Sequence, residues 1–469
     1  MGTSKLGGFL VGRIPQWLPA TLIALSLVAI GTLLTAPLYS TPDRSGTTDE
    51  LRFPTLDEHR NRYATGPTSI LLGIGAEPSE RRLSWFTDTG VHETVQVAEG
   101  SHETMPALAV TVAAEEQAQS ARPGHDYVHA TLTNLSPGTY SYRVGSERAG
   151  WSKIEQFEIY HQNVDHEFTF ISDAQIGASG NRADDAAGWQ RALQANDELF
   201  PDSQFVLSAG DQVEADYTGN IAEYQAYIAP PQMRTQASAQ TLGNHDYNLF
   251  TPQRLYHQHY NQPNLADYDA TRGTYWFVYN DVLHLNISSE YENWDEHREF
   301  LESTIAEHSD ETQWTILTFH RALHGAANHA VDSSTTDALR DGLGPVIIDL
   351  DIDLVLNGHD HSYARSFLID SDGQQVHPKT SEEQADHGSV SVTPKADETL
   401  FITANSSSGS KYYELVDADS YRDGFEPRFR DQQYEPNITG IAVDQCSLTA
   451  TTVEFDGTAV DTVKLLRDC

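Results

Sequence analysis

Five short segments of the sequence place Asp, Asn, Gln or His side chains directly after an apolar run, where they could hold metal ions. Carboxylate, amide oxygen and imidazole groups together suit borderline and hard ions such as Fe, Mn or Zn. No thiolate is available beside them, which argues against a structural zinc knot. Two ions about 4 Å apart need a bridging anion, and one aspartate between two strands can supply it. The clusters are, in chain order, Asp173 with Gln175, Asp211 with Glu214, Asn244 with His245 and Asp246, His320, and His359 with His361.

Strands are predicted to position these clusters. The apolar runs include Phe168-Thr-Phe-Ile-Ser and Leu354-Val-Leu. Ligands bind beyond the carboxyl ends of strands in α/β sheets, so five such ends could converge on one site. Gly210, Gly243 and Gly358 allow the backbone to turn sharply there. One such polar residue alone is usually a turn or a solvated side chain, but five in one order indicate a functional site.

The rest of the chain is predicted to divide into a β-rich part and an α/β part. Short strands separated by Gly, Pro, Asn and Ser fill residues 67–160 and predict an all-β sandwich. From residue 165 strands alternate with amphipathic helices, predicted at 186–200 and 296–308, which indicates an α/β domain. Strand-like runs return at 438–466 and are expected to close that domain.

The composition favours an acidic globular protein of about two or three domains. The formal net charge of the 469 residues is -39, from 68 acidic against 29 basic side chains. Long-range repulsion argues against nucleic acid as a general partner. Such acidity is typical of halophilic proteins and also of ordinary secreted ones, and we favour the second interpretation. The only cysteines, Cys446 and Cys469, would form a disulfide in an exported protein, with two free thiols as the alternative.

Residues 1–40 are predicted to be an export signal peptide or a membrane anchor. Lys5 and Arg13 precede the nearly uncharged stretch 17–39, which just reaches the roughly 20 residues that span a bilayer. A cleaved signal and a retained anchor are equally compatible with this length, and a buried core helix is a less favoured third alternative. Polar residues 41–66 are interpreted as a linker. We therefore expect an extracellular or cell-surface protein.

The order of the five segments resembles the calcineurin-like metallophosphoesterases, and most closely the purple acid phosphatase branch of that family. Gly210-Asp, Gly243-Asn-His-Asp and Gly358-His-Asp-His carry the likeness most specifically, and the following Tyr363-Ala-Arg looks like the family's ending. The β-rich part resembles that branch's fibronectin type III-like N-terminal domain, through Leu83-Ser-Trp-Phe-Thr and the run that leads up to Tyr142.

The resemblance covers the chain from about Pro67 to the C-terminus and implies its fold. That fold is an α+β multidomain arrangement, in which a fibronectin-like sandwich at 67–160 precedes a metallophosphoesterase domain at 165–469. The second domain would be an α/β sandwich with a βαβαβ core and a C-terminal β segment.

The resemblance also implies roles for individual residues. Two metal ions (Fe, Mn or Zn) would share Asp211. His245 would contact the substrate phosphate or protonate the leaving group. His329 stands about where the family keeps another substrate-contacting histidine, and His324 competes for that role, with a solvated loop histidine as the alternative for either. The remaining ligands would be Asp173 and His361 for the first ion and Asn244, His320 and His359 for the second.

The chain departs from the family's pattern at two positions. Glu214 replaces the metal-binding tyrosine of the purple enzymes, so an iron-tyrosinate colour should be absent. Gln175 stands where other metallophosphoesterases often place a ligand histidine. Either side chain could complete the first site through an oxygen atom, and we favour Gln175.

The expected function is that of a hydrolase acting on phosphoric ester bonds. A metal-bound hydroxide would attack phosphate monoesters, because a metal ion lowers the pKa of water from about 15.7 toward about 7. The partner would be a small-molecule phosphate ester. One alternative is a phosphodiesterase for cyclic nucleotides or phospholipid headgroups, on the same metals. A second alternative, from another class, is a cell-surface binding protein built on the fibronectin-like module, which needs no pair of transition-metal ions.

Overall fold

The computed structural model describes residues 66–162, 165–214, 220–246, 254–331, 336–376 and 390–467. The signal peptide or anchor predicted at 1–40 lies outside the described residues, as do Cys469 and all but the last residue of the predicted linker. Export and the disulfide therefore stay predictions. Within the described ranges, no helix is both long enough and apolar enough to cross a membrane.

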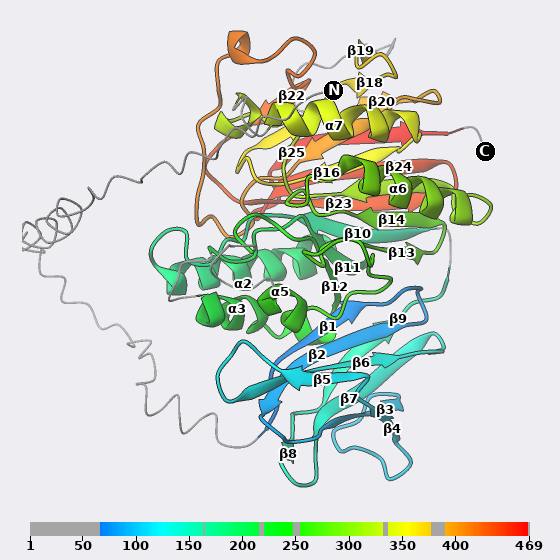
Figure 1. Cartoon of the computed structure of the whole chain (residues 1–469), viewed down its shortest axis with the longest axis vertical. Coiled ribbons are helices and arrows are strands. Elements are labelled where there is room, and N and C mark those ends of the chain that lie inside the picture. Colours follow the sequence, from blue (N-terminus) through cyan, green and yellow to red (C-terminus); the bar gives the residue numbers. More distant parts are fainter. Residues whose placement is uncertain are drawn as a thin grey trace, which may run out of the picture. The chain divides into compact units, whose positions relative to one another are not determined.

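The N-terminal part is a β-rich domain of two layers (Figure 1). Strands β1, β2, β6 and β5 form one layer, and β4, β3, β7, β8 and β9 form the other. Between them lies an apolar core that includes Leu83, Trp85, Val128 and Tyr142. The strands are β1 (Thr68–Ile74), β2 (Arg81–Asp88), β3 (Thr94–Glu99), β4 (Val110–Ala113), β5 (Glu116–Gln119), β6 (His125–Leu132), β7 (Gly138–Ser146), β8 (Gly150–Trp151) and β9 (Glu155–Ile159).

The C-terminal part contains two facing sheets with helices on their outer sides. Aromatic and aliphatic side chains such as Phe168, Phe205 and Leu354 fill the space between the sheets. The first sheet runs β20-β25-β24-β23-β10-β11-β12, and the second runs β13-β14-β15-β16-β21-β17-β22. The first contains β10 (His166–Ile171), β11 (Ser203–Ser208), β12 (Ala237–Gln240), β20 (Val390–Val392), β23 (Asn437–Asp444), β24 (Ser447–Glu454) and β25 (Ala459–Leu466). The second contains β13 (Tyr275–Tyr279), β14 (Val282–Asn286), β15 (Trp314–Thr318), β16 (Leu354–Asn357), β17 (Tyr363–Arg365), β21 (Leu400–Thr403) and β22 (Phe429–Asp431); β18 (Leu368–Ile369) and β19 (Gln375–Val376) form a separate hairpin.

The helices cover the outer faces of these two sheets. Trp189 of α2 and Tyr227 of α3 pack against the first sheet, and Leu301 of α6 and Ile347 of α7 pack against the second. The helices are α2 (Arg182–Leu199), α3 (Asn220–Ile228), α4 (Gln232–Thr235), α5 (Arg254–His259), α6 (Trp294–His308) and α7 (Thr336–Asp349), with short 3-10 turns η1 (Asn328–Val331) and η2 (Ala418–Ser420). The predicted fold class, a β-rich domain followed by an α/β domain, is confirmed.

Helix α2 begins at Arg182, whereas the sequence predicts a start near residue 186. The first turn uses a polar side chain to hold a neighbouring loop, and this side chain interrupts the amphipathic pattern by which the helix is predicted. The buried Asp185 carboxylate accepts the backbone N–H groups of Gly177 and Ser179 at 2.9 and 3.3 Å. An acidic side chain at a helix N-terminus is also favourable for the helix dipole. The first turn of α2 therefore fastens the loop that carries Asp173 and Gln175.

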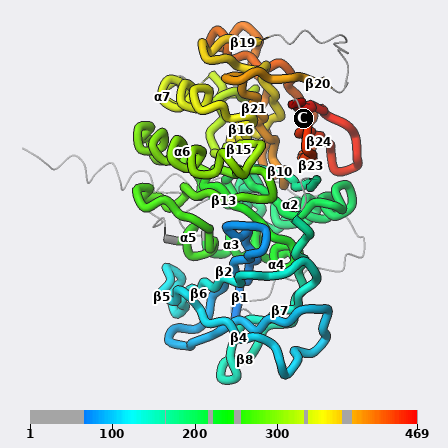
Figure 2. Tube along the Cα trace, turned by 90° about the vertical axis from the view of Figure 1, so that its right-hand side faces the viewer, coloured from blue at the N-terminus to red at the C-terminus, as the bar shows by residue number. Residues whose placement is uncertain are grey.

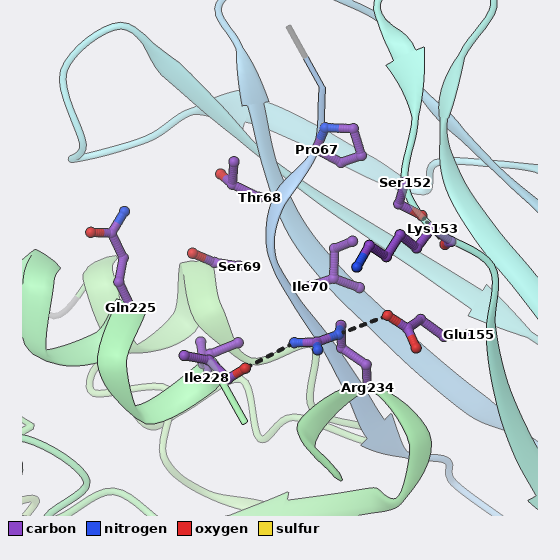
Figure 3. A pocket seen from close by; sticks show the side chains of 11 residues that line it. Pro67, Thr68, Ser69, Ile70, Ser152, Lys153, Glu155, Gln225, Ile228 and Arg234 are labelled. Carbon is purple, nitrogen blue, oxygen red and sulfur yellow. Dashed lines mark hydrogen bonds and ion pairs between the residues drawn. The ribbon is translucent and has the colours of Figure 1, made fainter. Parts of the chain in front are cut away.

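The two parts of the molecule share one sheet, which the sequence does not predict. Strand β1 pairs in parallel with β12 at Gly73 and Ser238, so the β-rich layer continues the first catalytic sheet. Side-chain bonds reinforce this junction, including Arg234 Nε to Glu155 at 3.0 Å (Figure 3). The same ion pair borders a cavity of about 410 Å³ at the junction. The shared sheet holds the β-rich domain rigidly against the catalytic domain.

Candidate metal centre

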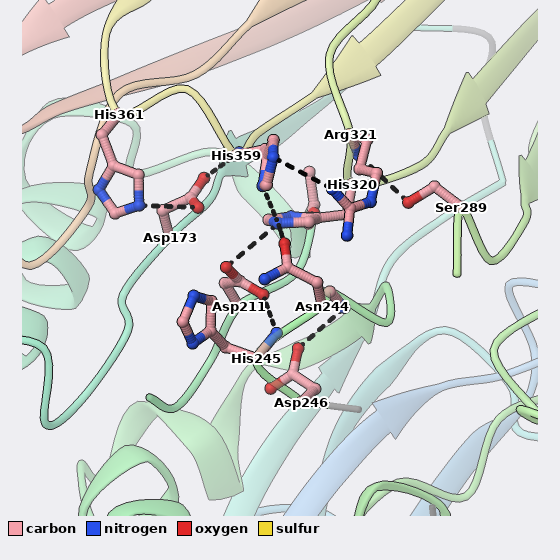
Figure 4. A network of polar contacts seen from close by, with 12 residues as sticks. Asp173, Asp211, Asn244, His245, Asp246, Ser289, His320, Arg321, His359 and His361 are labelled. Carbon is pink, nitrogen blue, oxygen red and sulfur yellow. Dashed lines mark hydrogen bonds and ion pairs between the residues drawn. The ribbon is translucent and has the colours of Figure 1, made fainter. Parts of the chain in front are cut away.

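The five polar clusters all lie at the carboxyl ends of parallel strands. Strands β10, β11 and β12 run parallel in one sheet, and β15 and β16 run parallel in the other. The loops after these strands carry, in turn, the Asp173, Asp211, Asn244, His320 and His359 segments. Because the two sheets face each other, their strand ends meet at one edge. Figure 4 shows the five segments converging there, as the sequence predicts.

The backbone around the centre is strained in the way that functional sites often are. Asp173, Gln175, Asp211, His359 and His361 all have positive φ, between 36° and 72°. Non-glycine residues seldom adopt this region, and each such residue costs on the order of 1–3 kcal/mol. Five such residues in one site remain in this conformation only because the surrounding strands fix the loops.

Three turns in these loops need glycine for close approach as well as for bending. A Cβ atom on Gly358 would lie 1.9 Å from Ser172 Oγ, and one on Gly243 would lie 2.2 Å from Asp211 Oδ1. Gly210 has a φ of +107° and would bring a Cβ atom 2.8 Å from His320 Nδ1. Any larger residue at these positions would push a candidate ligand out of place.

The centre is built around His320, which is fully buried. Its Nδ1 lies 2.9 Å from the carbonyl oxygen of Ala209, so Nδ1 donates its proton there and Nε2 faces inward. Asp211 Oδ2, Asn244 Oδ1 and His359 Nδ1 each lie 3.1 Å from that Nε2 (Figure 4). Four lone-pair atoms thus meet at one point.

A second group of ligand atoms lies beside the first. His361 Nε2 is 3.3 Å from Asp173 Oδ1, and His361 Nδ1 bonds the carbonyl oxygen of Lys411 at 2.9 Å. Asp173 Oδ2 accepts the backbone N–H of His359 at 2.8 Å, which ties the two groups together. Asp173, Asp211 and His361 are all buried. The arrangement presents one carboxylate oxygen and one imidazole nitrogen to the same point.

These donors fit a pair of metal ions. At most one proton can be shared among the four atoms around His320 Nε2, so lone pairs face one another without a cation. Asp173 Oδ1 and both side-chain atoms of Gln175 are buried and have no hydrogen-bond partner among the described residues. Buried polar atoms are normally satisfied, and a bound cation would satisfy the oxygens here. The donor set, all oxygen and imidazole nitrogen, suits Fe, Mn or Zn.

The pKa values of His359 and His361 agree with this assignment, whereas His320 is protonated without an ion and has to release that proton when one binds. Burial lowers the pKa of His361 to about 3 and lowers that of His359 well below its usual value, so both rings are neutral ligands at neutral pH. Burial also lowers the pKa of His320, but the Asp211 carboxylate outweighs it and raises that pKa to about 9. Conversely, burial raises the pKa of Asp211, and the His320 and His245 charges outweigh it, so the pKa falls and Asp211 stays ionised.

Gln175 and Glu214, the two alternatives for completing the first site, differ in their surroundings. Gln175 is fully buried beside Asp211, whose carbonyl oxygen accepts its backbone N–H at 2.8 Å. Glu214 is half-buried, and its carboxylate lies 3.6 Å from His245 Nδ1. Its carbonyl oxygen also accepts a hydrogen bond from that nitrogen at 3.0 Å. Glu214 therefore positions His245, which supports the preference for Gln175 as the ligand.

The side chain of His245 points away from the ligand cluster, whereas its backbone N–H is bonded to a member of that cluster. Its N–H donates to Asp211 Oδ1 at 2.8 Å. Because Nδ1 is held by the Glu214 carbonyl oxygen, Nε2 is the atom left to face a substrate. The side chain is 28% exposed, enough to reach a molecule that arrives from solvent.

His329 and His324 separate clearly in the structure. The His329 ring lies 4.1 Å from the ring of His359, and its Nε2 lies 3.4 Å from Tyr413 Oη. His324 is buried between Phe401 and Phe425, with ring centroids 4.6 and 5.0 Å away. The solvated-loop interpretation of His324 is therefore wrong, because its loop folds inward onto two aromatic rings. Of the two, only His329 borders the metal centre.

Three further residues shape the site without a clear signal in the sequence. Arg321 follows His320; its Nη1 lies 3.4 Å from His359 Nε2, and its guanidinium pairs with Glu290. Lys411 lies beside Tyr413, with Nζ 5.0 Å from the ring centre. The buried Asp360 carboxylate accepts the backbone N–H of His329 at 3.1 Å and those of two preceding residues. Only the position of Asp360, between two histidine ligands, could have drawn attention to it.

The colour of an iron-loaded protein tests the Glu214 replacement. We expect no strong visible tyrosinate-to-iron band, because the position of the metal-binding tyrosine holds a carboxylate. The measurement is an absorption spectrum after loading with Fe³⁺. Tyr413, whose ring lies 5.1 Å from that of His361, is an alternative phenolate beside the candidate ligands. A purple preparation that loses its colour in Tyr413→Phe would contradict the expectation.

Family comparisons match both parts of the chain. Residues 67–159 match the family described as Purple acid Phosphatase, N-terminal domain. Residues 166–363 match the family described as Calcineurin-like phosphoesterase, a range that includes every candidate metal ligand named above. A comparison with curated proteins finds no significant match.

One solved structure shows the same fold. The purple acid phosphatase PPD1 from yellow lupin (Lupinus luteus) seeds superimposes with a TM-score of 0.67 at 16% sequence identity, covering 86% of this chain and 75% of that chain. GAP50, the anchor in the inner membrane complex of Plasmodium, gives a TM-score of 0.41 at 14% identity, covering 66% of this chain and 90% of that chain. At such identity the lupin structure establishes the shared fold alone.

Proposed function

Because the chain carries a calcineurin-like phosphoesterase domain behind a purple acid phosphatase N-terminal domain, we propose that it is an exported phosphatase that hydrolyses phosphate monoesters. The family match makes it a hydrolase of phosphoric ester bonds with a centre of two metal ions. The observation that carries the proposal is the meeting of Asp211, Asn244 and His359 at 3.1 Å around His320 Nε2.

The ligand residues would hold the two ions as a bridged pair. Asp211 reaches the His320 cluster through Oδ2 and lies close to the Asp173 and His361 group, so it is the best-placed shared ligand. When bound, the ions would lower the pKa of a water molecule enough to supply hydroxide near neutral pH, and would neutralise phosphate oxygens. Every proposed ligand except the half-buried Asn244 is buried, which suits a preorganised site.

The half-buried residues at the rim would handle the substrate. As an imidazolium, His245 would donate its Nε2 proton to the departing alkoxide, while its Nδ1–H stays bonded to the Glu214 carbonyl oxygen. Arg321 and His329 flank His359 on the substrate side and would hold phosphate oxygens. No side chain of this group needs to attack phosphorus, so no covalent phosphoenzyme is expected.

The rim charges favour a monoester over a diester. A monoester phosphate carries about two negative charges near neutral pH, and a diester carries one. Arg321 and Lys411 both lie at the edge of the centre. Despite burial, the Glu290 carboxylate keeps the pKa of Arg321 above its usual value, and Tyr413, followed by Glu214 and Asp211, does the same for Lys411. Together they provide two cationic groups, one for each negative charge of a monoester. Export rests on the basic and then apolar stretch 5–39, and fractionation of expressing cells tests it.

Removal of metal tests the proposed function. Chelation of the full chain followed by desalting should lower hydrolysis of p-nitrophenyl phosphate by at least about 100-fold, because the nucleophile depends on the ions. Readdition of Mn²⁺, Fe²⁺ or Zn²⁺ should restore it. Bis(p-nitrophenyl) phosphate, measured in parallel, should be the poorer substrate; a better rate with it would establish the diesterase instead. Full activity in thoroughly metal-free protein would contradict the whole proposal.

A further inference from the structure

A second cluster of metal-binding side chains lies at the junction of the two domains. Glu116 Oε2 lies 3.7 Å from His129 Nδ1 and 3.6 Å from His257 Nε2. One ligand atom from each residue lies within 4.8 Å of the others. None of the three belongs to the loops that carry the catalytic ligands. We propose that Glu116, His129 and His257 form a separate site for one borderline divalent cation, such as Zn²⁺.

Each domain contributes to this site. Glu116 on β5 and His129 on β6 are direct partners in the antiparallel ladder, so their side chains leave the sheet on the same face. His257 comes from α5 of the catalytic domain, which packs against β6 (Figure 2). The domain junction thus brings His257 to two ladder partners that lie far before it in the sequence.

The distances are close to those of a bound zinc ion. Ligand atoms about 2.0–2.1 Å from a tetrahedral ion lie roughly 3.3 Å from one another. The distances from Glu116 Oε2 to His129 Nδ1 and to His257 Nε2, 3.7 and 3.6 Å, exceed that value by only a few tenths of an ångström. Two imidazoles and one carboxylate leave the fourth position to water. The Glu116 side chain is 43% exposed, so an ion can enter from solvent.

A neighbouring hydroxyl orients the carboxylate. Tyr127 Oη donates to Glu116 Oε1, which leaves Oε2 to face the histidines. Tyr127 lies two residues before His129 on the same strand, and its ring contacts both His129 and His257, with centroids 5.1 and 6.0 Å away. Residues that hold a ligand in orientation in this way are a common feature of metal sites.

Both imidazoles are in the form that binds metal. Burial lowers the pKa of His129 to about 3 and that of His257 to about 4, and the exposed Arg272 guanidinium lowers both further. The rings are therefore neutral at neutral pH, with a free lone pair each. His129 Nε2 and both ring nitrogens of His257 have no hydrogen-bond partner among the described residues. A bound ion would satisfy His257 Nε2, the nitrogen that faces Glu116.

The consequence of such a site would be structural. A cation held by β5, β6 and α5 would fasten the β-rich domain to the helix that follows the catalytic Asn244 loop in the chain. Binding to the folded state alone would stabilise this junction in proportion to the logarithm of the free ion concentration. Catalysis would not depend on it directly.

The test is a zinc count on the full chain. After loading with Zn²⁺ and desalting, the unmutated protein should retain about three ions per chain, and Glu116→Gln should retain about two. By calorimetry, Glu116→Gln should weaken the affected site at least about 10-fold. Glu115→Gln is the matched control, because its exposed side chain bonds Thr131 and neither histidine side chain. Hydrolysis of p-nitrophenyl phosphate should be the same in all three proteins.

Two results would overturn the site. One is an unmutated protein that binds only two ions, a measurement that needs no variant to fold. The other is an unchanged ion count and affinity in Glu116→Gln, whose fold is checked by circular dichroism. Asp211→Asn separates this site from the catalytic one, because it should lose catalytic ions and keep the ion held by Glu116. Loss of every ion in Asp211→Asn would also count against an independent site.

Discussion

Asp211→Asn should lower both metal content and phosphatase turnover, with a fall in kcat of at least about 10³-fold. Asp211 is 1% exposed, and its two oxygens have separate tasks. Oδ1 accepts the backbone N–H of His245 at 2.8 Å, and Oδ2 lies 3.1 Å from His320 Nε2. An asparagine that keeps the first bond through its oxygen must turn its NH₂ group toward the ligand cluster. That group has no lone pair to offer a metal ion, so the ligand is lost. Metal analysis and initial rates on the same preparation measure the two effects together.

The control for this variant follows from the structure. Asp246 lies in the neighbouring loop but is unsuitable, because its buried carboxylate accepts the backbone N–H groups of Gly243 and Gln212 at 2.9 and 3.1 Å. The sequence gives Asp246 no role, whereas the structure shows that it shapes the turn that presents Asn244. Asp184, exposed in the first turn of α2, offers the same Asp-to-Asn change without such contacts to the loops. Equal activity in Asp211→Asn and Asp184→Asn would exclude Asp211 as the bridge.

The convergence of the candidate ligands was predictable because strand ends impose their own geometry. An apolar run followed by Asp, Asn or His identifies both the strand and the point at which the chain leaves the sheet, and glycine marks the turn. His320 and His359 therefore fall within 3.1 Å of each other although 39 residues separate them. The same pattern predicts Asp173 and His361 as ligands, and their Oδ1 and Nε2 atoms lie 3.3 Å apart. Here local sequence and global fold specify the same atoms.

The substrate side was less predictable because loops, and not strands, place it. Arg321 and Lys411 are ordinary charged residues in the sequence, and only tertiary contacts bring them to the centre. His324 and His329 have similar sequence surroundings, yet one is buried under Phe401 and Phe425 and the other lies against His359. The backbone bond from His329 to Asp360 decides this difference. Such a contact has no periodic signature in the sequence.

The domain junction could not be predicted either, because it too depends on tertiary contacts. Strand β1 has the composition of a sandwich strand, and its parallel pairing with β12 depends on a register that only the assembled sheet sets. The cluster of Glu116, His129 and His257 is hidden in the same way, because its residues follow no known spacing for metal ligands.

His245→Ala should keep both metal ions and yet lose roughly 10²–10⁴ in rate on substrates with poor leaving groups. The backbone N–H of residue 245 donates to Asp211 Oδ1, and alanine preserves that bond. What disappears is the imidazole, whose Nδ1 is held by the Glu214 carbonyl oxygen so that Nε2 can serve as the proton donor. An alkyl phosphate needs that proton because an alkoxide is a poor leaving group, whereas nitrophenolate leaves unaided.

The loss in His245→Ala should therefore shrink strongly when p-nitrophenyl phosphate replaces an alkyl phosphate, and this dependence on the leaving group distinguishes proton donation from a general disturbance of the site. His359→Ala is the matched comparison, because it removes a ligand atom 3.1 Å from His320 Nε2. That variant should lose metal affinity and should slow both substrates by similar factors, since the ions serve every ester alike. Metal content falling as far in His245→Ala as in His359→Ala would show that His245 is itself a ligand. An equal rate loss on both substrates, with metal retained, would instead place His245 at the phosphate oxygens, where it would stabilise charge and transfer no proton.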